Sequence, residues 1–230
     1  RHAAAVAAHL GTDHTELYVT AADAQAVIPA LPAIYDEPFA DSSQIPTHLV
    51  SRLARDSVTV SLSGDGGDEL FGGYNRYLAG ERVARFNRRT PPAICRALAA
   101  AITAVPVSVW DSGAKDLRSL LPNRYQIPQI GDKAHKFAGL LASRNGRDLY
   151  RDTCSQWPDP MDVLVNGSEP ETLIDREDLW RGDDDLPHAM MLMDALTYLP
   201  DDILTKVDRA SMAVGLESRI PLLDHRVFDF

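Results

Sequence analysis

The sequence contains few cysteines, and this shortage excludes several classes of protein. Only Cys95 and Cys154 occur in 230 residues. Two cysteines at this separation form neither a zinc-binding pattern nor a disulfide framework. Since no local signature marks either residue as a nucleophile, we interpret both as structural thiols in a reducing compartment, the cytoplasm.

Long hydrophobic runs are lacking as well. The longest apolar stretch covers residues 97–110 and includes Pro106, so it is too short for a helix that crosses a bilayer. Residue 1 does not begin a signal peptide. The sequence therefore predicts no membrane partner.

Basic residues are too few to balance the acidic ones. The chain has 23 Lys and Arg residues against 33 Asp and Glu residues, for a net charge of -10. This charge disfavours a general nucleic-acid binder, which needs a basic face for the phosphates. A nucleotide ligand stays compatible with the charge, because a bound metal ion reverses the local electrostatics.

Helix and strand signals alternate over the first 75 residues. Helices are expected at residues 3–10, 22–28 and 46–55, and strands at residues 16–20 and 58–62. Such alternation is typical of an α/β unit with a parallel sheet. From residue 78 to residue 204, proline-interrupted segments rich in alanine and leucine predict short helices instead. We therefore expect one domain, with an α/β portion at 1–77 and a mainly helical portion at 78–230.

An acidic, glycine-rich loop follows the second predicted strand. Residues 58–62 are β-branched and apolar, which predicts a buried strand. The loop Ser63–Glu69 cannot continue this strand, because its glycines favour tight turns. A short helix is expected to begin at Asp68 and to end at Gly72. In a strand–loop–helix arrangement, free backbone N–H groups can face a phosphate at the carboxyl edge of the sheet.

This loop matches neither of two common phosphate-binding motifs. No Gly-Lys-Ser/Thr follows it, and Glu69 stands where a dinucleotide-binding loop has its third glycine. Its carboxylates would repel a phosphate unless Asp68 holds Mg²⁺ together with the phosphate oxygens. The residue types alone also allow a plain turn in which Asp65 or Asp68 caps the helix, and without further evidence we would favour that turn.

Four blocks of sequence resemble the asparagine synthetase family, whose members adenylate a carboxylate with ATP. The loop block is SGDGGDELFGGY at 63–74. The other blocks are DEPFADSS at 36–43, LPDDILTKVDRASM at 199–212 and LESRIPLLD at 216–224. The blocks follow the family order. The resemblance implies that family's C-terminal synthetase domain, an α/β fold with an adenine-nucleotide α-hydrolase-like parallel sheet.

The resemblance also implies a reaction and a nucleotide site. In a glutamine-hydrolysing asparagine synthase, ATP adenylates the side chain of aspartate, and ammonia from glutamine then gives asparagine, AMP and pyrophosphate. By similarity, Asp68 would be a Mg²⁺ ligand. Asp65 lies where relatives vary, so it would also tune the second substrate. The residues that would contact the nucleotide are Ser63, Gly64, Asp65, Gly66 and Gly67.

Two further groups of residues have both a functional and a structural explanation. Glu217 matches a family glutamate at the reaction centre, where it would accept a proton or position the amine, but it could equally form a structural ion pair. The triplet Asp41, Ser42 and Ser43 would shape the aspartate or AMP pocket, although capping of the next helix explains it about as well.

Lys206 is spaced for a helical ion pair. It lies four residues after Asp202 on a predicted helix, and this spacing is typical of a solvated pair on a helix surface. We therefore do not expect Lys206 to be catalytic.

Several parts of the family's active site do not occur in these 230 residues. The pyrophosphate loop is expected before Arg1, and the catalytic lysine is expected after Phe230. The glutaminase domain, with its terminal cysteine, is also missing. We therefore expect a fragment that does not make asparagine on its own, with a homodimer as one option for the oligomeric state.

Two alternatives to an asparagine synthase stay open. β-Lactam synthetases, lasso-peptide cyclases and cell-surface amidotransferases use the same adenylating core on other substrates. A relative without activity would instead bind Mg-nucleotide as a regulatory module. The presence of Asp68 and Glu217 speaks against this second alternative.

Overall fold

The chain forms two compact units, which are described separately. One consists of Arg1–Gly67 with Tyr198–Phe230, and the other of Asp68–Thr197. The computed structural model describes residues 2–118, 129–143, 145–155, 157, 165, 167–180 and 185–229. The C-terminal segment therefore belongs to the same unit as the N-terminal part, a division different from the predicted portions 1–77 and 78–230.

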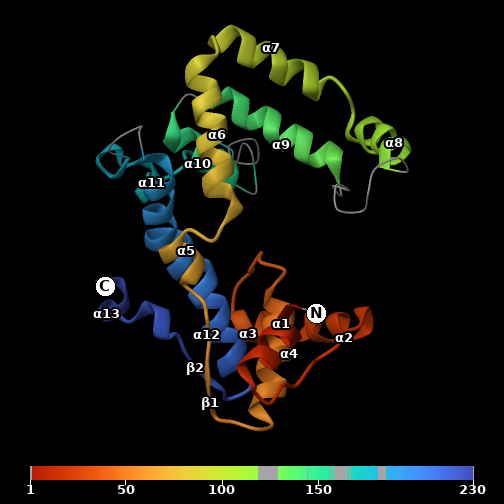
Figure 1. Ribbon diagram of the computed structural model, residues 1–230, viewed down its shortest axis with the longest axis vertical. Coiled ribbons are helices and arrows are strands. Elements are labelled where there is room, and N and C mark those ends of the chain that lie inside the picture. The colour runs from red at the N-terminus through yellow and green to blue at the C-terminus, as the bar shows by residue number, and fades with distance from the viewer. Residues whose placement is uncertain are drawn as a thin grey trace. The chain divides into compact units, whose positions relative to one another are not determined.

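The first unit contains a parallel pair of strands, β1 (Val60–Leu62) and β2 (Glu217–Arg219) (Figure 1). Val60 pairs with Glu217, and Leu62 pairs with Arg219. The predicted parallel sheet is thus confirmed. The predicted burial of β1 is wrong, because Leu62 is 75% exposed. Parallel strands are buried when helices cover both faces of the sheet, and β1 lacks such cover among the described residues.

The strand predicted at residues 16–20 is not formed. These residues lie between two helices without regular structure, and Tyr18 is exposed. A β-prone segment forms a strand only where a partner strand and a surface to pack on are available. Composition alone therefore overestimated the number of strands.

The rest of the first unit is built mainly of helices. The predicted helix at residues 3–10 is confirmed, and Gly11 ends it with a φ of +65°. α12 packs against α3, α4 and β2. The helices of this unit are α1 (His2–Leu10), α2 (Ala21–Val27), α3 (Leu31–Tyr35), α4 (Gln44–Arg55), α12 (Thr205–Met212) and α13 (His225–Phe228), with the 3-10 turns η1 (Ile28–Ala30) and η8 (Pro221–Leu223). A π-helical segment, η7 (Asp194–Leu204), crosses the boundary between the units.

The second unit is helical, as the sequence predicts. α7 lies alongside α9, and α11 packs against α6 (Figure 1). The core of this unit includes Tyr77, Leu149, Tyr150, Met190 and Met193. Its helices are α5 (Gly67–Phe71), α6 (Asn75–Arg89), α7 (Pro92–Thr103), α8 (Val107–Arg118), α9 (Ile130–Ala142), α10 (Gly146–Cys154) and α11 (Leu186–Met193), with the 3-10 turns η4 (Leu173–Asp175) and η5 (Glu177–Leu179).

Two features of the second unit bear on the expectations about membranes and thiols. None of the described helices is by itself long and apolar enough to cross a bilayer. The segments Pro92–Thr103 and Val107–Gly113 have the required length and composition only as a pair bent by 78°. Cys95 is a buried free thiol, and Cys154 is a half-buried one.

Candidate functional site

The acidic glycine loop leaves the carboxyl end of β1. The N–H group of Ser63 donates to the carbonyl oxygen of Arg219 at 2.8 Å, so the ladder continues to the first residue of the loop. The Oγ atom of Ser63 donates to Oδ2 of Asp65 and accepts from the N–H group of Asp65 at 3.4 Å. These bonds hold Ser63 and Asp65 in one tight turn at the strand end.

Two glycines of this loop are required by close packing. A side chain at Gly66 would collide with Leu223, and the φ of Gly66 is +78°. A Cβ atom at Gly67 would lie 2.9 Å from Cδ1 of Leu222. Both leucines belong to η8, directly after β2. They support the loop from one side, a role that their place in a family block does not indicate.

Asp68 follows Gly67 on α5 and begins the second unit. Its side chain is exposed, and its carboxylate occupies the space where a side chain at Gly73 would project. The N–H group of Gly73 donates to the carbonyl oxygen of Asp68 at 2.9 Å. Gly72, with a φ of +68°, ends the helix as predicted. Asp68 is therefore held at the start of a very short helix by the two glycines that follow it.

The neighbouring carboxylate of Glu69 has a different environment. Glu69 is buried, and its Oε1 atom accepts a hydrogen bond from the hydroxyl of Tyr74 at 2.7 Å. Of the two consecutive carboxylates, only Asp68 is thus exposed to a ligand.

The surroundings of Asp68 fit one kind of magnesium site. Within the described ranges, no three His, Cys, Asp or Glu side chains are arranged to hold a metal ion. Mg²⁺ is commonly bound by one or two carboxylates, while substrate phosphates and water complete its shell. A single exposed carboxylate next to a glycine turn fits a Mg²⁺ ion that arrives with a nucleotide.

Glu217 lies at the opposite end of the strand pair from the loop. It is the first residue of β2 and pairs with Val60, two residues before the end of β1. Each residue of a parallel strand adds about 3.3 Å. The exposed Oε1 atom of Glu217 accepts from Nε of Arg219 at 2.8 Å. Glu217 thus forms a structural ion pair with Arg219, and its role at the reaction centre stays a prediction.

Asp41 is the centre of a half-buried polar cluster at the start of α4. Its Oδ2 atom accepts from Nζ of Lys206 at 2.6 Å and from Oγ of Ser43 at 2.7 Å. Its Oδ1 atom accepts from the N–H group of Ser43 at 2.8 Å. Ser42 is exposed. Ser43 precedes α4, but its side chain does not cap the helix, so capping does not explain this serine.

The expected solvated pair between Lys206 and Asp202 is wrong. Lys206 is buried and pairs with Asp41, because the packing of α12 on α4 turns this lysine inward. The i,i+4 spacing predicts contacts only between residues of one helix. It therefore could not predict the contact between Lys206 and Asp41, which lies outside α12.

The pKa values of Asp41 and of the neighbouring Asp202 are shifted in opposite directions. Burial acts to raise the pKa of Asp41, but hydrogen bonds from Lys206 and Ser43 outweigh burial and lower that pKa. Burial, and then the charge of Asp41, raise the pKa of Asp202. Oδ1 of Asp202 is buried and has no hydrogen-bond partner within the part of the chain that the structure describes. Burial also raises the pKa of Tyr35, to about 12.

Known proteins resemble this chain over most or all of its length. The family model described as asparagine synthase matches residues 1–230. A putative asparagine synthetase (glutamine-hydrolyzing) 2 of Methanocaldococcus jannaschii is 36% identical over 204 residues, which are 87% of this chain and 35% of that protein. Asparagine synthetase (glutamine-hydrolyzing) 1 of Bacillus subtilis is 29% identical over 228 residues, which are 97% of this chain and 32% of that protein.

A putative asparagine synthetase (glutamine-hydrolyzing) of Mycobacterium bovis is 30% identical over 232 residues, covering 98% of this chain and 32% of that protein. The chain thus spans about a third of the length of these relatives. No solved structure matches it significantly. Since the family model covers every residue, the chain belongs to the asparagine synthase family.

Proposed function

We propose that the protein containing this chain is an ATP-dependent amide-forming ligase of the asparagine synthase type. It would adenylate the side chain of aspartate and transfer ammonia from glutamine, giving asparagine, AMP and pyrophosphate. The loop Ser63–Asp68, at the carboxyl end of a parallel strand and at the start of α5, carries this proposal. Membership of the family and the names of the relatives support it.

In this proposal the loop binds the phosphates of ATP. The glycine turn exposes backbone N–H groups at the start of α5, where an anion is favoured. Asp68 holds Mg²⁺, which offsets the phosphate charge. Asp65, hydrogen-bonded to Ser63, lies beside the reacting groups and tunes the second substrate. The strand pair belongs to a sheet of the adenine-nucleotide α-hydrolase class.

The polar cluster around Asp41 would form a wall of the aspartate or AMP pocket. Lys206 donates a hydrogen bond to the Asp41 carboxylate, and that carboxylate accepts from both the hydroxyl and the N–H group of Ser43. Glu217 would accept a proton or position the amine after its ion pair with Arg219 opens. The enzyme would act in the cytoplasm on small molecules, as a homodimer, without nucleic-acid or membrane partners.

Exchange of labelled pyrophosphate into ATP tests this proposal on the protein that contains the chain. We expect exchange that depends on aspartate and Mg²⁺. The Asp68→Asn variant should lose most of this exchange. The Arg85→Gln variant should retain it, because the exposed Arg85 pairs only locally with Glu81 on α6.

The same assay separates the alternatives. Exchange with another carboxylate but not with aspartate would assign the protein to the related cyclases or amidotransferases. Tight ATP binding in a calorimeter, without exchange for any carboxylate, would identify a non-catalytic nucleotide-binding relative.

A further inference from the structure

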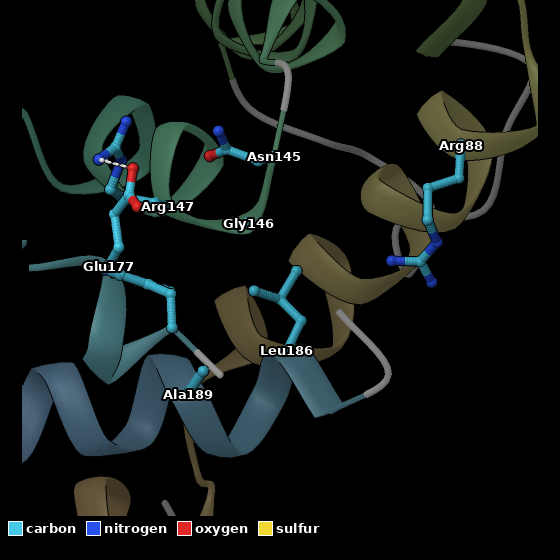
Figure 2. A pocket seen from close by; sticks show the side chains of 8 residues that line it. Arg88, Asn145, Gly146, Arg147, Glu177, Leu186 and Ala189 are labelled. Atoms are coloured by element: carbon cyan, nitrogen blue, oxygen red, sulfur yellow. Dashed lines mark ion pairs between the residues drawn. The ribbon is translucent and has the colours of Figure 1, made fainter. Parts of the chain in front are cut away.

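The helical unit contains two adjoining cavities that the proposed reaction does not use. One has a volume of about 650 Å³ and lies among α6, α7, α9 and α10. The other, of about 200 Å³, lies among the end of α6, the start of α10, η5 and α11 (Figure 2). Arg88, Asn145 and Gly146 line both cavities. We therefore treat them as two parts of one hollow.

The sequence that contains two of the lining arginines is rich in arginine, although the chain as a whole is acidic. Residues 75–96 contain six arginines and a single acidic residue, Glu81, in a chain whose net charge is -10. Arg88 on α6 and Arg96 on α7 line the larger cavity. Guanidinium groups present planar sets of donors that match carboxylate and phosphate oxygens. The local charge thus favours an anionic ligand.

The smaller cavity adds a third arginine, Arg147, whose Nη1 atom donates to the carbonyl oxygen of Asp175 at 3.5 Å. Arg147 lines it, and the Nε atom of Arg147 is buried with no hydrogen-bond partner in the described part of the chain. The same Nε atom forms a long ion pair with Oδ1 of Asp148, 3.6 Å away. Glu177 is the only acidic residue among the described lining residues. It is exposed, and its distance of 4.0 Å from Arg147 makes a weak pair (Figure 2).

The start of α10 supplies further attraction for an anion. Asn145 caps this helix by accepting from the N–H group of Asp148 at 2.8 Å. Gly146 is the first residue of the helix, whose N-terminal end carries a partial positive charge. A Cβ atom at Gly146 would lie 2.6 Å from Cδ1 of Leu186, so glycine lets the helix start approach the wall formed by α11.

The remaining walls are apolar and would suit the body of an organic ligand. Leu141, Ala142 and Leu149 line the larger cavity, and Trp180 and Leu186 line the smaller one. We infer that the hollow binds a small organic anion. Its phosphate or carboxylate head lies near Arg88 and the start of α10, and its apolar body lies against these side chains. This site belongs to the helical unit and is independent of the proposed ligase chemistry.

Calorimetric titration of the intact protein, without ATP, tests this inference. The probes are 1-naphthyl phosphate and 1-naphthoate, with uncharged 1-naphthol as their matched control. We expect at least one anion to bind and 1-naphthol to bind at least tenfold more weakly, because each charge-assisted hydrogen bond contributes about a factor of ten. The tighter of the two anions identifies the head group.

Three variants locate the binding. The double variant Arg88→Gln, Arg96→Gln should weaken it by about tenfold or more. Arg85→Gln, on the same helix but outside the hollow, should leave Kd within about twofold, as expected for an exposed charge. Ala142→Trp should weaken binding by filling the larger cavity from an exposed position, without removing any charge.

Two results would overturn the inference. One is the failure of both anions to bind the unaltered protein. The other is binding that the variants of the hollow leave unchanged, since the anion would then occupy another site. Circular dichroism spectra that match the parent protein would confirm that each variant is folded.

Discussion

The Nζ atom of Lys206 lies 2.6 Å from Oδ2 of Asp41, although the two residues are 165 positions apart in the sequence. The Lys206 side chain is only 9% exposed and that of Asp41 only 19%. The pair joins α12 to the segment just before α4. It thereby connects two of the family blocks, residues 199–212 and residues 36–43. A charge left without its partner at a buried site is costly, so the loss of either partner should destabilise the unit that carries the strand pair.

Replacement of Lys206 should therefore destabilise the first unit. Lys206→Met leaves the Asp41 carboxylate buried without its cation, and we expect the free energy of unfolding to fall by about 3 kcal/mol. Urea denaturation measures this loss. Arg209→Met is the matched control on the same helix, since its pair with Asp36 is exposed and should contribute less than about 1 kcal/mol. Equal losses for the two variants would contradict the buried-pair interpretation.

The same pair predicts how stability depends on pH. The pKa of Asp41 is lowered in the folded protein, so the unfolded chain takes up the proton first as the pH falls. The stabilisation by Asp41 is therefore complete above the ordinary aspartate pKa of about 3.9, and it is lost as the pH falls through the lowered pKa. Asp41→Asn should reduce the acid dependence of the unfolding free energy between roughly pH 2 and pH 5. An unchanged acid limb would show that Asp41 does not titrate in this way.

Asp202 should show the opposite sign. Its pKa is raised in the folded protein, so its contribution to stability is greatest below the ordinary aspartate pKa and falls as the pH rises through the raised value. Asp202→Asn removes a buried charge beside Asp41. We expect this variant to have a higher Tm relative to the parent protein at pH 7 than at about pH 3.5. A gain that is the same at both pH values would point to packing instead.

In the helical unit, Asp194 should be the most sensitive carboxylate. It is fully buried and accepts from Arg76 at 2.7 Å, from Tyr150 at 2.7 Å and from the hydroxyl of Tyr77. Burial, and then the hydrogen bond to Asp194, raise the pKa of Tyr77. Asp194→Leu removes the shared acceptor of these donors, and we expect a loss of about 3 kcal/mol in thermal or urea unfolding.

Asp152 provides the control for Asp194. It is exposed, and its Oδ2 atom accepts from Oγ of Ser143 at 2.6 Å. Asp152→Leu should change the unfolding free energy by no more than about 0.5 kcal/mol, as for most surface substitutions. A small effect of Asp194→Leu, comparable with this control, would show that the buried network contributes little.

Gly73 should be required for the position of Asp68. A methyl group at residue 73 would collide with the Asp68 carboxylate, so Gly73→Ala should displace that side chain and weaken the Mg²⁺ dependence of ATP binding. A Mg²⁺ titration at fixed ATP measures this effect. Gly139→Ala on α9 is the control, since no atom of the described residues lies within 4 Å of its added methyl group. Alanine should stabilise that helix by about 1 kcal/mol and leave Mg²⁺ dependence unchanged.

Local features of the sequence determined the helices and the turns. Gly11 ends α1 and Gly72 ends α5 with positive φ angles that favour glycine, while Pro91 lies between α6 and α7 and Pro106 between α7 and α8. Such features act over a few neighbouring residues, so they could be recognised without a fold. The order Ser63–Glu69 likewise predicted a loop between a strand and a helix, and this order is what the structure contains.

Only the tertiary structure decided which distant residues meet. It paired β1 with β2, placed Leu222 and Leu223 against the loop glycines, and turned Lys206 toward Asp41. It also left β1 exposed and residues 16–20 without a strand partner. These outcomes depend on packing between segments far apart in the chain, and neither propensity nor i,i+4 spacing carries that information. The sequence thus determined the residues of the candidate site, and the fold decided which of them are in contact.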